Sequence, residues 1–255
     1  MRFASLGSGS EGNGLLVEAD GTRVLVDCGF GIRDTVARLS RIGVSPDTIS
    51  AIIVTHEHSD HIGGVAPFAM RFGTPVWLTF GTLSIVSEQF AGLPCVRGFD
   101  SHDRFAIDAI EVCPFPVPHD AREPVQFVCS DGCWRLGVLT DIGVSTPYVE
   151  ATLSGCDALV LECNHALDLL ANGDYPFSLK QRIASKFGHL DNGAAAGLLA
   201  RLDNSRLKHL IAAHLSQNNN LPALARAALA AALDCDPDWI GIADQHLGFG
   251  WREFI

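Results

Sequence analysis

The sequence predicts an α/β protein in which two β-sheets pack face to face between outer layers of helices, a four-layer αββα sandwich. Three observations support this fold class. Short apolar runs of strand length dominate the first half of the chain, strands and helices alternate in the second half, and 47% of the 255 residues are apolar whereas 18% are charged. A chain of this length and composition buries a large core, so we expect a single domain over residues 1–255.

Apolar runs bounded by Gly, Asp and Ser predict the strands of the first half. They are Arg2–Leu6, Leu15–Ala19, Arg23–Asp27, Ala51–Thr55, Val76–Leu78, Phe105–Ile107, Ile110–Phe115, Gln126–Ser130 and Trp134–Thr140. The helices expected there are Ile32–Ile42, which stops before Gly43, and also Gly63–Phe72 and Thr82–Phe90. The second half is expected to form strand Ala158–Glu162, helices Ser178–Gly188 and Gly193–Leu202, strand Leu207–Ala213 and helix Pro222–Leu233.

Composition narrows the class of protein. The formal net charge of −11 excludes a basic surface over the whole molecule, although it leaves room for a local basic groove. The first residues are polar, so we expect no signal peptide. A membrane span needs about 20 consecutive apolar residues, and no stretch of the chain is that long, so we expect a cytoplasmic protein. The eight cysteines form no CxxC pair, and most are expected to be reduced, buried thiols.

The strongest motif directly follows the predicted strand Ala51–Thr55. Three histidines and an aspartate fall within six residues in the order HxHxDH, at His56, His58, Asp60 and His61. Imidazole and carboxylate are the ligand types that hold zinc-like cations. A buried strand that ends at these residues fixes their backbone and leaves one side open to water, so the motif predicts a metal site.

Further metal-competent side chains follow other apolar runs. His119 comes after Val112–Val117, Asp141 follows Leu136–Thr140, and His214 follows Leu210–Ala213. An α/β scaffold gathers its site at the carboxyl ends of its strands. Any one of these residues is more typical of a structural role, but together with the HxHxDH motif they predict one shared metal centre.

The chain resembles the metallo-β-lactamase superfamily over nearly its whole length. The resemblance lies in the order of the metal-competent residues: the HxHxDH motif, then His119, Asp141 and finally His214. The resemblance implies that His56, His58 and His119 hold one cation, that Asp60, His61 and His214 hold a second, and that Asp141 bridges them. It also implies a metal-bridging hydroxide as nucleophile, a catalytic part for Asp60 besides ligation, and a supporting role for Asp27. Two divalent ions are expected, with zinc favoured and manganese or iron also compatible.

Several local strings resemble one branch of that superfamily, the YycJ/WalJ (VicX) family. They are GSGSEGNG at 7–14, VTHEHSDH at 54–61, LTDIG at 139–143, LECNHALDLL at 161–170, YPFSLKQRIASKFGHLDN at 175–192 and AHLSQNNN at 213–220. This family groups near phosphodiesterases such as ribonuclease Z and is linked to exonuclease action on DNA. The resemblance therefore implies a phosphodiesterase with a DNA substrate.

The same resemblance gives roles to two more residues. His189 matches a histidine that is held over the scissile phosphate, and Glu162 matches the acidic residue that orients it. A His–Glu pair is chemically suited to supply a proton to the leaving oxygen. The alternatives are a structural histidine at a helix start and a structural glutamate.

Other polar residues near these motifs remain open. His165 either contacts phosphate or shapes the segment 164–170, and Ser216 and Asn218 either donate to phosphate or belong to a polar loop. The GSGSEGNG segment lacks a following GK, so it is not a P-loop; it lines the site or forms a plain turn. Six basic residues in 180–208 form either a nucleic-acid contact or a solvated helical face.

A second enzyme class shares the same metal ligands. Thioester or lactone hydrolysis of the glyoxalase II type needs no histidine that faces a phosphate, so the His189–Glu162 pair disfavours it. A metal-binding regulatory protein without activity is disfavoured by the full ligand set. The sequence does not determine the native metal, whether the substrate is DNA or RNA, the direction of cleavage along the strand, or the oligomeric state.

Overall fold

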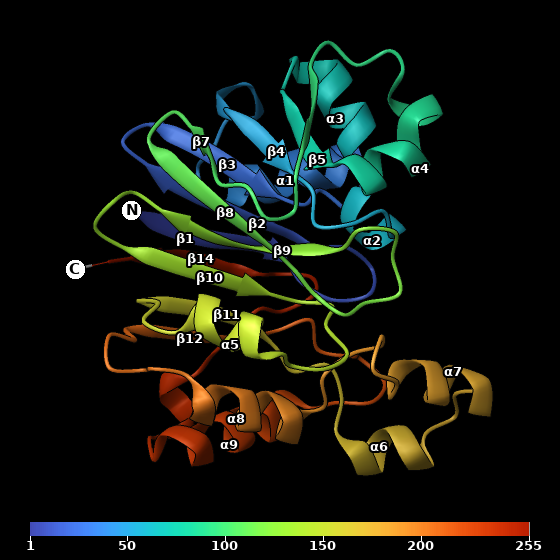
Figure 1. Cartoon of the computed structure of the whole chain (residues 1–255), viewed down its shortest axis with the longest axis vertical. Coiled ribbons are helices and arrows are strands. Elements are labelled where there is room, and N and C mark those ends of the chain that lie inside the picture. The colour runs from blue at the N-terminus through green and yellow to red at the C-terminus, as the bar shows by residue number, and fades with distance from the viewer. Residues whose placement is uncertain (255) are drawn as a thin grey trace.

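Two seven-stranded sheets packed face to face form the centre of the molecule, which a computed structural model describes over residues 1–254 (Figure 1). The first sheet has the order β14-β1-β2-β3-β4-β5-β6 and the second the order β13-β12-β11-β10-β9-β8-β7. Both sheets are mixed. β3 to β6 run parallel to one another, as do β10 to β13, and the remaining pairs are antiparallel.

The strands of the first sheet are β1 (Arg2–Gly7), β2 (Gly14–Ala19), β3 (Thr22–Val26), β4 (Ala51–Ile53), β5 (Val76–Thr79), β6 (Val96–Phe99) and β14 (Phe249–Glu253). Those of the second sheet are β7 (Phe105–Ile107), β8 (Ile110–Pro116), β9 (Val125–Ser130), β10 (Arg135–Leu139), β11 (Ala158–Glu162), β12 (His209–Ala213) and β13 (Gly241–Ile242).

Alternating side chains divide the core into three apolar layers. In β3, Val24 and Val26 face the second sheet whereas Leu25 faces the outer helices; in β11, Val160 faces the first sheet and Leu161 the helices on the other side. These central strands therefore bury both of their faces, unlike edge strands such as β14, which is largely exposed. This accounts for the continuous apolar runs in the sequence, since a strand covered on one side only would alternate with polar residues.

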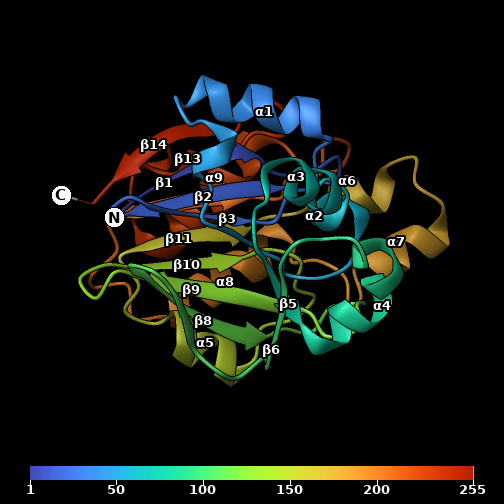
Figure 2. The same cartoon turned by 90° about the horizontal axis from the view of Figure 1, so that it is seen from above.

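Helices cover both outer faces (Figures 1 and 2). The first sheet is covered by α1 (Ile32–Arg41), α3 (Val65–Phe72) and α4 (Phe80–Phe90), and the second by α5 (Pro147–Leu153), α8 (Asn192–Arg201) and α9 (Pro222–Leu233). This arrangement confirms the αββα sandwich. Two single 3₁₀ turns, Pro46–Thr48 and Pro237–Trp239, precede β4 and β13.

Three short helices lie at one edge of the sandwich instead of on its faces. They are α2 (Ser59–Ile62), α6 (Leu167–Asn172) and α7 (Phe177–Ile183), and both views place them at the same edge (Figures 1 and 2). The carboxyl ends of β4, β8, β10, β11 and β12 lead into the loops of this edge. Among residues 1–254, no helix has the length and apolar character that crossing a bilayer requires.

The structure corrects the sequence-based boundaries at several places. The expected helix Ser178–Gly188 ends at Ile183, because the chain turns there and the His189 amide donates to the Ile183 carbonyl. The sequence does not predict β6, β13, β14, α2, α5 or α6. All eight cysteines are free thiols. Four are buried (Cys28, Cys129, Cys156 and Cys163), three are half-buried (Cys95, Cys113 and Cys235) and Cys133 is exposed, so full burial holds for half of them and not for most.

Candidate metal centre

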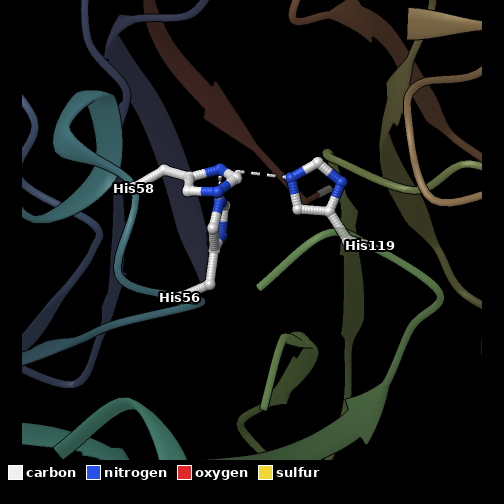
Figure 3. Close-up of side chains that lie close together, drawn as sticks. All are labelled: His56, His58 and His119. Atoms are coloured by element: carbon white, nitrogen blue, oxygen red, sulfur yellow. Dashed lines mark hydrogen bonds between the residues drawn. The ribbon is translucent and has the colours of Figure 1, made fainter. Parts of the chain in front are cut away.

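Three histidines from two loops bring their ring nitrogens together. His56 and His58 follow β4, and His119 follows β8. His56 Nε2 lies 3.0 Å from His58 Nδ1, which lies 3.3 Å from His119 Nε2. The three rings lie edge-on to one another with their nitrogens converging (Figure 3), and one nitrogen of each lies within 4.8 Å of the others. This spacing suits a single cation held by three imidazoles.

A second group lies beside the first. Asp60 and His61 belong to α2, and His214 directly follows β12. Asp60 Oδ2 lies 3.3 Å from His61 Nε2 and 3.6 Å from His214 Nε2. The Asp141 carboxylate stands between the two groups. Its Oδ2 is 3.1 Å from His61 Nε2, and its Oδ1 is 3.6 Å from His214 Nε2 and 3.9 Å from His119 Nε2.

Two buried atoms of this cluster test whether a cation fits. Asp141 Oδ2 and His214 Nε2 are both buried and make no hydrogen bond within the described chain. Most buried polar atoms in proteins have a hydrogen-bond partner. Both atoms belong to residues that the sequence proposes as ligands, so a bound cation would satisfy them, and the donor set fits a metal site.

Charge interactions hold protons on part of this cluster. Burial lowers the pKa of His214, but Asp141, Asp60 and Glu162 raise it, to about 10. Burial also lowers the pKa of His61, yet Asp141, Asp27 and Asp60 raise it well above its ordinary value. For His56, burial and the neighbouring His61 lower the pKa. A cation therefore competes with protons at His61 and His214 but not at His56.

Asp27, at the end of β3, fixes the ligand loop. Its Oδ1 accepts the Thr55 amide and its Oδ2 accepts the Thr55 hydroxyl, each at 2.8 Å. Oδ2 also lies 2.8 Å from His61 Nδ1. A carboxylate on the far nitrogen of an imidazole sets its tautomer and leaves Nε2 for a cation. The structure thus places Asp27 where the resemblance implied a supporting role.

The glycine-rich loop between β1 and β2, for which the sequence allows either a part in the site or a plain turn, supports the ligands. The Asn13 amide donates to the Asp60 carbonyl at 2.8 Å, and its side-chain Nδ2 donates to Asp60 Oδ2 at 3.4 Å. Ser8 Oγ accepts the His214 amide at 3.0 Å. A plain turn between strands would not reach two ligand segments. This supporting role is visible only because the folded loop lies next to the HxHxDH motif. No pattern within GSGSEGNG indicates it.

Glu162, the last residue of β11, is buried and makes several hydrogen bonds. His189 Nδ1 donates to its Oε1 at 2.9 Å and His214 Nδ1 at 3.1 Å, while the amides of Asp141, Ile142 and Leu190 donate to its two oxygens at 3.0–3.1 Å. His189 and His214 lower the pKa of Glu162 although burial raises it. Glu162 thus orients a candidate ligand as well as His189, whereas the sequence had connected it with His189 alone.

A cleft of about 410 Å³ opens onto this cluster. Asp60, Asp141, His189 and His214 line it together with residues of α7. His189 is partly exposed there, and because its Nδ1 faces Glu162, its Nε2 remains for a bound molecule. His189 Nδ1 also lies 3.6 Å from Asp141 Oδ1, so this histidine is next to the candidate ligands.

The remaining candidates occupy different positions. Ser216 lines the cleft, whereas the exposed Asn218 donates to the Tyr175 hydroxyl at 2.9 Å. His165 is only 1% exposed and does not line the cleft, which favours a role in shaping the segment after β11. Of the six basic residues in 180–208, only Arg182 lines the cleft. Arg206, for instance, pairs with Asp157 at the opposite end of β11.

Comparison with known proteins gives matches over most of the chain. The family model of the beta-lactamase superfamily domain matches residues 22–214. The exodeoxyribonuclease YycJ from Bacillus anthracis is 35% identical over a match that covers 92% of this chain and 89% of its own length. The exodeoxyribonuclease WalJ from Streptococcus pneumoniae is 32% identical, and that match covers 91% of this chain and 88% of WalJ. Among solved structures, the metallo-β-lactamase fold protein YhfI from Bacillus subtilis superposes with a TM-score of 0.78 over 99% of this chain and 98% of its own, at 15% identity.

The histidine–aspartate cluster, together with exodeoxyribonuclease relatives that match over nine-tenths of the chain, identifies this protein as a metal-dependent hydrolase. The chain belongs to the metallo-β-lactamase superfamily and, within it, to the family of YycJ and WalJ.

Proposed function

We propose that this protein is a dinuclear metal-dependent phosphodiesterase that acts on DNA as an exonuclease. The observation that carries the proposal is the His189–Glu162 pair, joined at 2.9 Å and lying in the same cleft as the candidate ligands. The relatives named exodeoxyribonucleases, which align over nine-tenths of the chain, support DNA as the substrate.

The proposed ligands divide into two sets around Asp141. His56, His58 and His119 would hold one cation, Asp60, His61 and His214 would hold the other, and Asp141 would contact both. Zinc suits this donor set, and manganese or iron is also compatible with it. When bound, two divalent cations supply an activated water and neutralise charge on the phosphate.

The chain's own contribution is to place a proton donor beside that phosphate. Glu162 accepts a hydrogen bond from Nδ1–H of His189 and so fixes the ring plane. Burial lowers the pKa of His189, but Glu162 raises it above its ordinary value, which favours the imidazolium with both ring nitrogens protonated. From that form Nε2 gives its proton to the leaving oxygen of the cleaved ester, and the neutral ring keeps its Nδ1 proton. Asp27 and Asn13 are not ligands in this proposal. Asp27 holds the His61 ring and the Thr55 side chain, and Asn13 holds the backbone of Asp60.

Substrate class is tested with three substrates on one metal-loaded preparation. These are bis(p-nitrophenyl) phosphate, DNA labelled at one end, and a glutathione thioester. We expect turnover of the small diester, stepwise shortening of the DNA from an end, and poor turnover of the thioester. Faster turnover of the thioester than of both diesters would replace this proposal with the glyoxalase II type of reaction. DNA products from internal cuts would contradict the exonuclease assignment.

A further inference from the structure

The cleft holds one arginine and no lysine among its described lining residues. That residue is Arg182, on α7, and it faces a lining that includes the carboxylates of Asp60, Asp120 and Asp141. The whole chain carries a net charge of −11. A polyanionic strand that enters this cleft therefore depends strongly on any fixed positive charge at its rim.

Arg182 is held in place through a single one of its nitrogens. Its Nε donates to Asp120 Oδ2. Its side chain is 59% exposed, and its two terminal NH₂ groups make no hydrogen bond to another group within residues 1–254. A guanidinium held in this way presents a fork of donors that matches two phosphate oxygens.

Asp120 connects this guanidinium with the ligand cluster. Its Oδ1 lies 3.4 Å from His119 Nε2 and 3.9 Å from His58 Nε2, on the side away from Arg182. Its amide donates to the Phe187 carbonyl at 3.0 Å, which joins it to the loop before His189. The carboxylate thus stands between Arg182 and the candidate ligands His58 and His119, where the reacting phosphate would bind in the proposed function.

We propose that Arg182 is a specificity-determining residue that binds a phosphate next to the one being cleaved, with Asp120 as its positioning residue. This inference rests on the proposed phosphodiesterase function and specifies its substrate as a strand with more than one phosphate. An exposed Arg–Asp pair contributes little to folding stability, so stability does not account for the pair. A substrate with a single phosphate gains less from this contact than an oligonucleotide does.

The test compares Arg182→Ala with the wild-type protein on bis(p-nitrophenyl) phosphate and on a labelled DNA oligonucleotide. We expect kcat/KM for the oligonucleotide to fall at least about tenfold more than kcat/KM for the small diester, mainly through KM. Loss of one phosphate contact also lowers the slope of log Kd against log salt concentration by about one. Arg182→Lys should restore part of the affinity, since it keeps the charge but loses the fork.

Arg201→Ala is the matched control. Arg201 is also exposed and pairs through Nε with a carboxylate, that of Glu150, but it lies on α8 and does not line the cleft. This variant should match the wild type on both substrates and in its salt slope. Equal losses on the two substrates, or an unchanged salt slope in Arg182→Ala, would overturn the inference while leaving the phosphodiesterase function intact. A wild-type protein that neither binds the oligonucleotide nor cleaves the small diester would refute both.

Discussion

Asp141 shows most clearly how single residues are arranged for metal binding. Its carboxylate is buried between two groups of histidines, and its backbone has a φ of 53°, in the left-handed region that most residues avoid. His214 shares this conformation, with a φ of 54°. Burial of a charged group and a left-handed backbone both cost stability, and such features concentrate at functional sites.

Asp141→Ala should lower the metal content more than loss of any other single ligand, because Asp141 faces both groups. We expect purified Asp141→Ala to retain fewer than about two divalent ions per chain by elemental analysis. Asp108→Ala is the matched control, since Asp108 also has a left-handed φ, of 47°, but lies in an exposed turn. Full metal content in Asp141→Ala would show that this carboxylate does not bridge two cations.

His189→Ala should lower diester turnover by roughly 10²–10⁴, the usual range for a general acid or base. Its metal content should stay unchanged, because His189 belongs to neither proposed ligand set. Kinetics and elemental analysis on one sample check both statements, with His102→Ala as the control because His102 is an exposed histidine outside the cleft. If His189→Ala lost a cation, His189 would be a metal ligand. If the variant kept both its metals and its full rate of diester turnover, His189 would have a structural role only.

At the scale of elements, the site depends on how closely the loops at the strand ends pack. The loop between α7 and His189 passes against the loop that follows Asp141. A Cβ atom at Gly143 would lie 2.3 Å from the Lys186 carbonyl carbon, so only glycine allows the two backbones to approach. The His119 ring is held here as well, since its Nδ1 lies 3.1 Å from the Gly188 carbonyl oxygen.

Gly143→Ala should therefore displace the loop that carries His189. We expect overpacking to cost roughly 1–3 kcal/mol of stability, seen as a fall of several degrees in Tm, together with a loss of diester turnover. Gly250→Ala is the control, because a Cβ atom there meets nothing within 4 Å. A variant as stable and as active as the wild type would show that the close approach is dispensable.

The sequence predicts elements well where the signal is local. Strands such as β3 and β11 are recognisable because both faces are buried, and the HxHxDH motif marks its own site. β14 was missed because it depends on pairing with β1 from the other end of the chain. α5 was missed although Pro147 at its first position and a capping Thr146 are local signals. Contacts between distant segments, such as Asn13 with Asp60, have no local signature at all.

At the scale of the whole molecule, the fold concentrates acidic groups and histidines at one edge of an acidic protein. The carboxylates of Asp27, Asp60 and Asp141 raise the pKa of His61, and Asp141, Asp60 and Glu162 raise that of His214 to about 10. These protons neutralise part of the charge when no cation is bound. Binding of a cation must release them.

Metal affinity should accordingly rise with pH. Both imidazoles have raised pKa values, so near neutral pH each carries a proton that the cation displaces, and this competition weakens as the pH rises toward those pKa values. Zinc binding measured by calorimetry at about pH 6 and about pH 8, in buffers of different ionisation enthalpy, should show tighter binding at the higher pH and net proton release. An affinity independent of pH would contradict the assigned ligands.

The central claim is that two cations held around Asp141 support hydrolysis of a phosphodiester. Its most direct test is a titration of chelator-treated protein with zinc or manganese, in which bis(p-nitrophenyl) phosphate turnover is followed against the number of ions bound per chain. The account predicts that turnover rises until about two ions are bound and then levels off. Full turnover with one ion per chain, or no turnover at any loading, would contradict it.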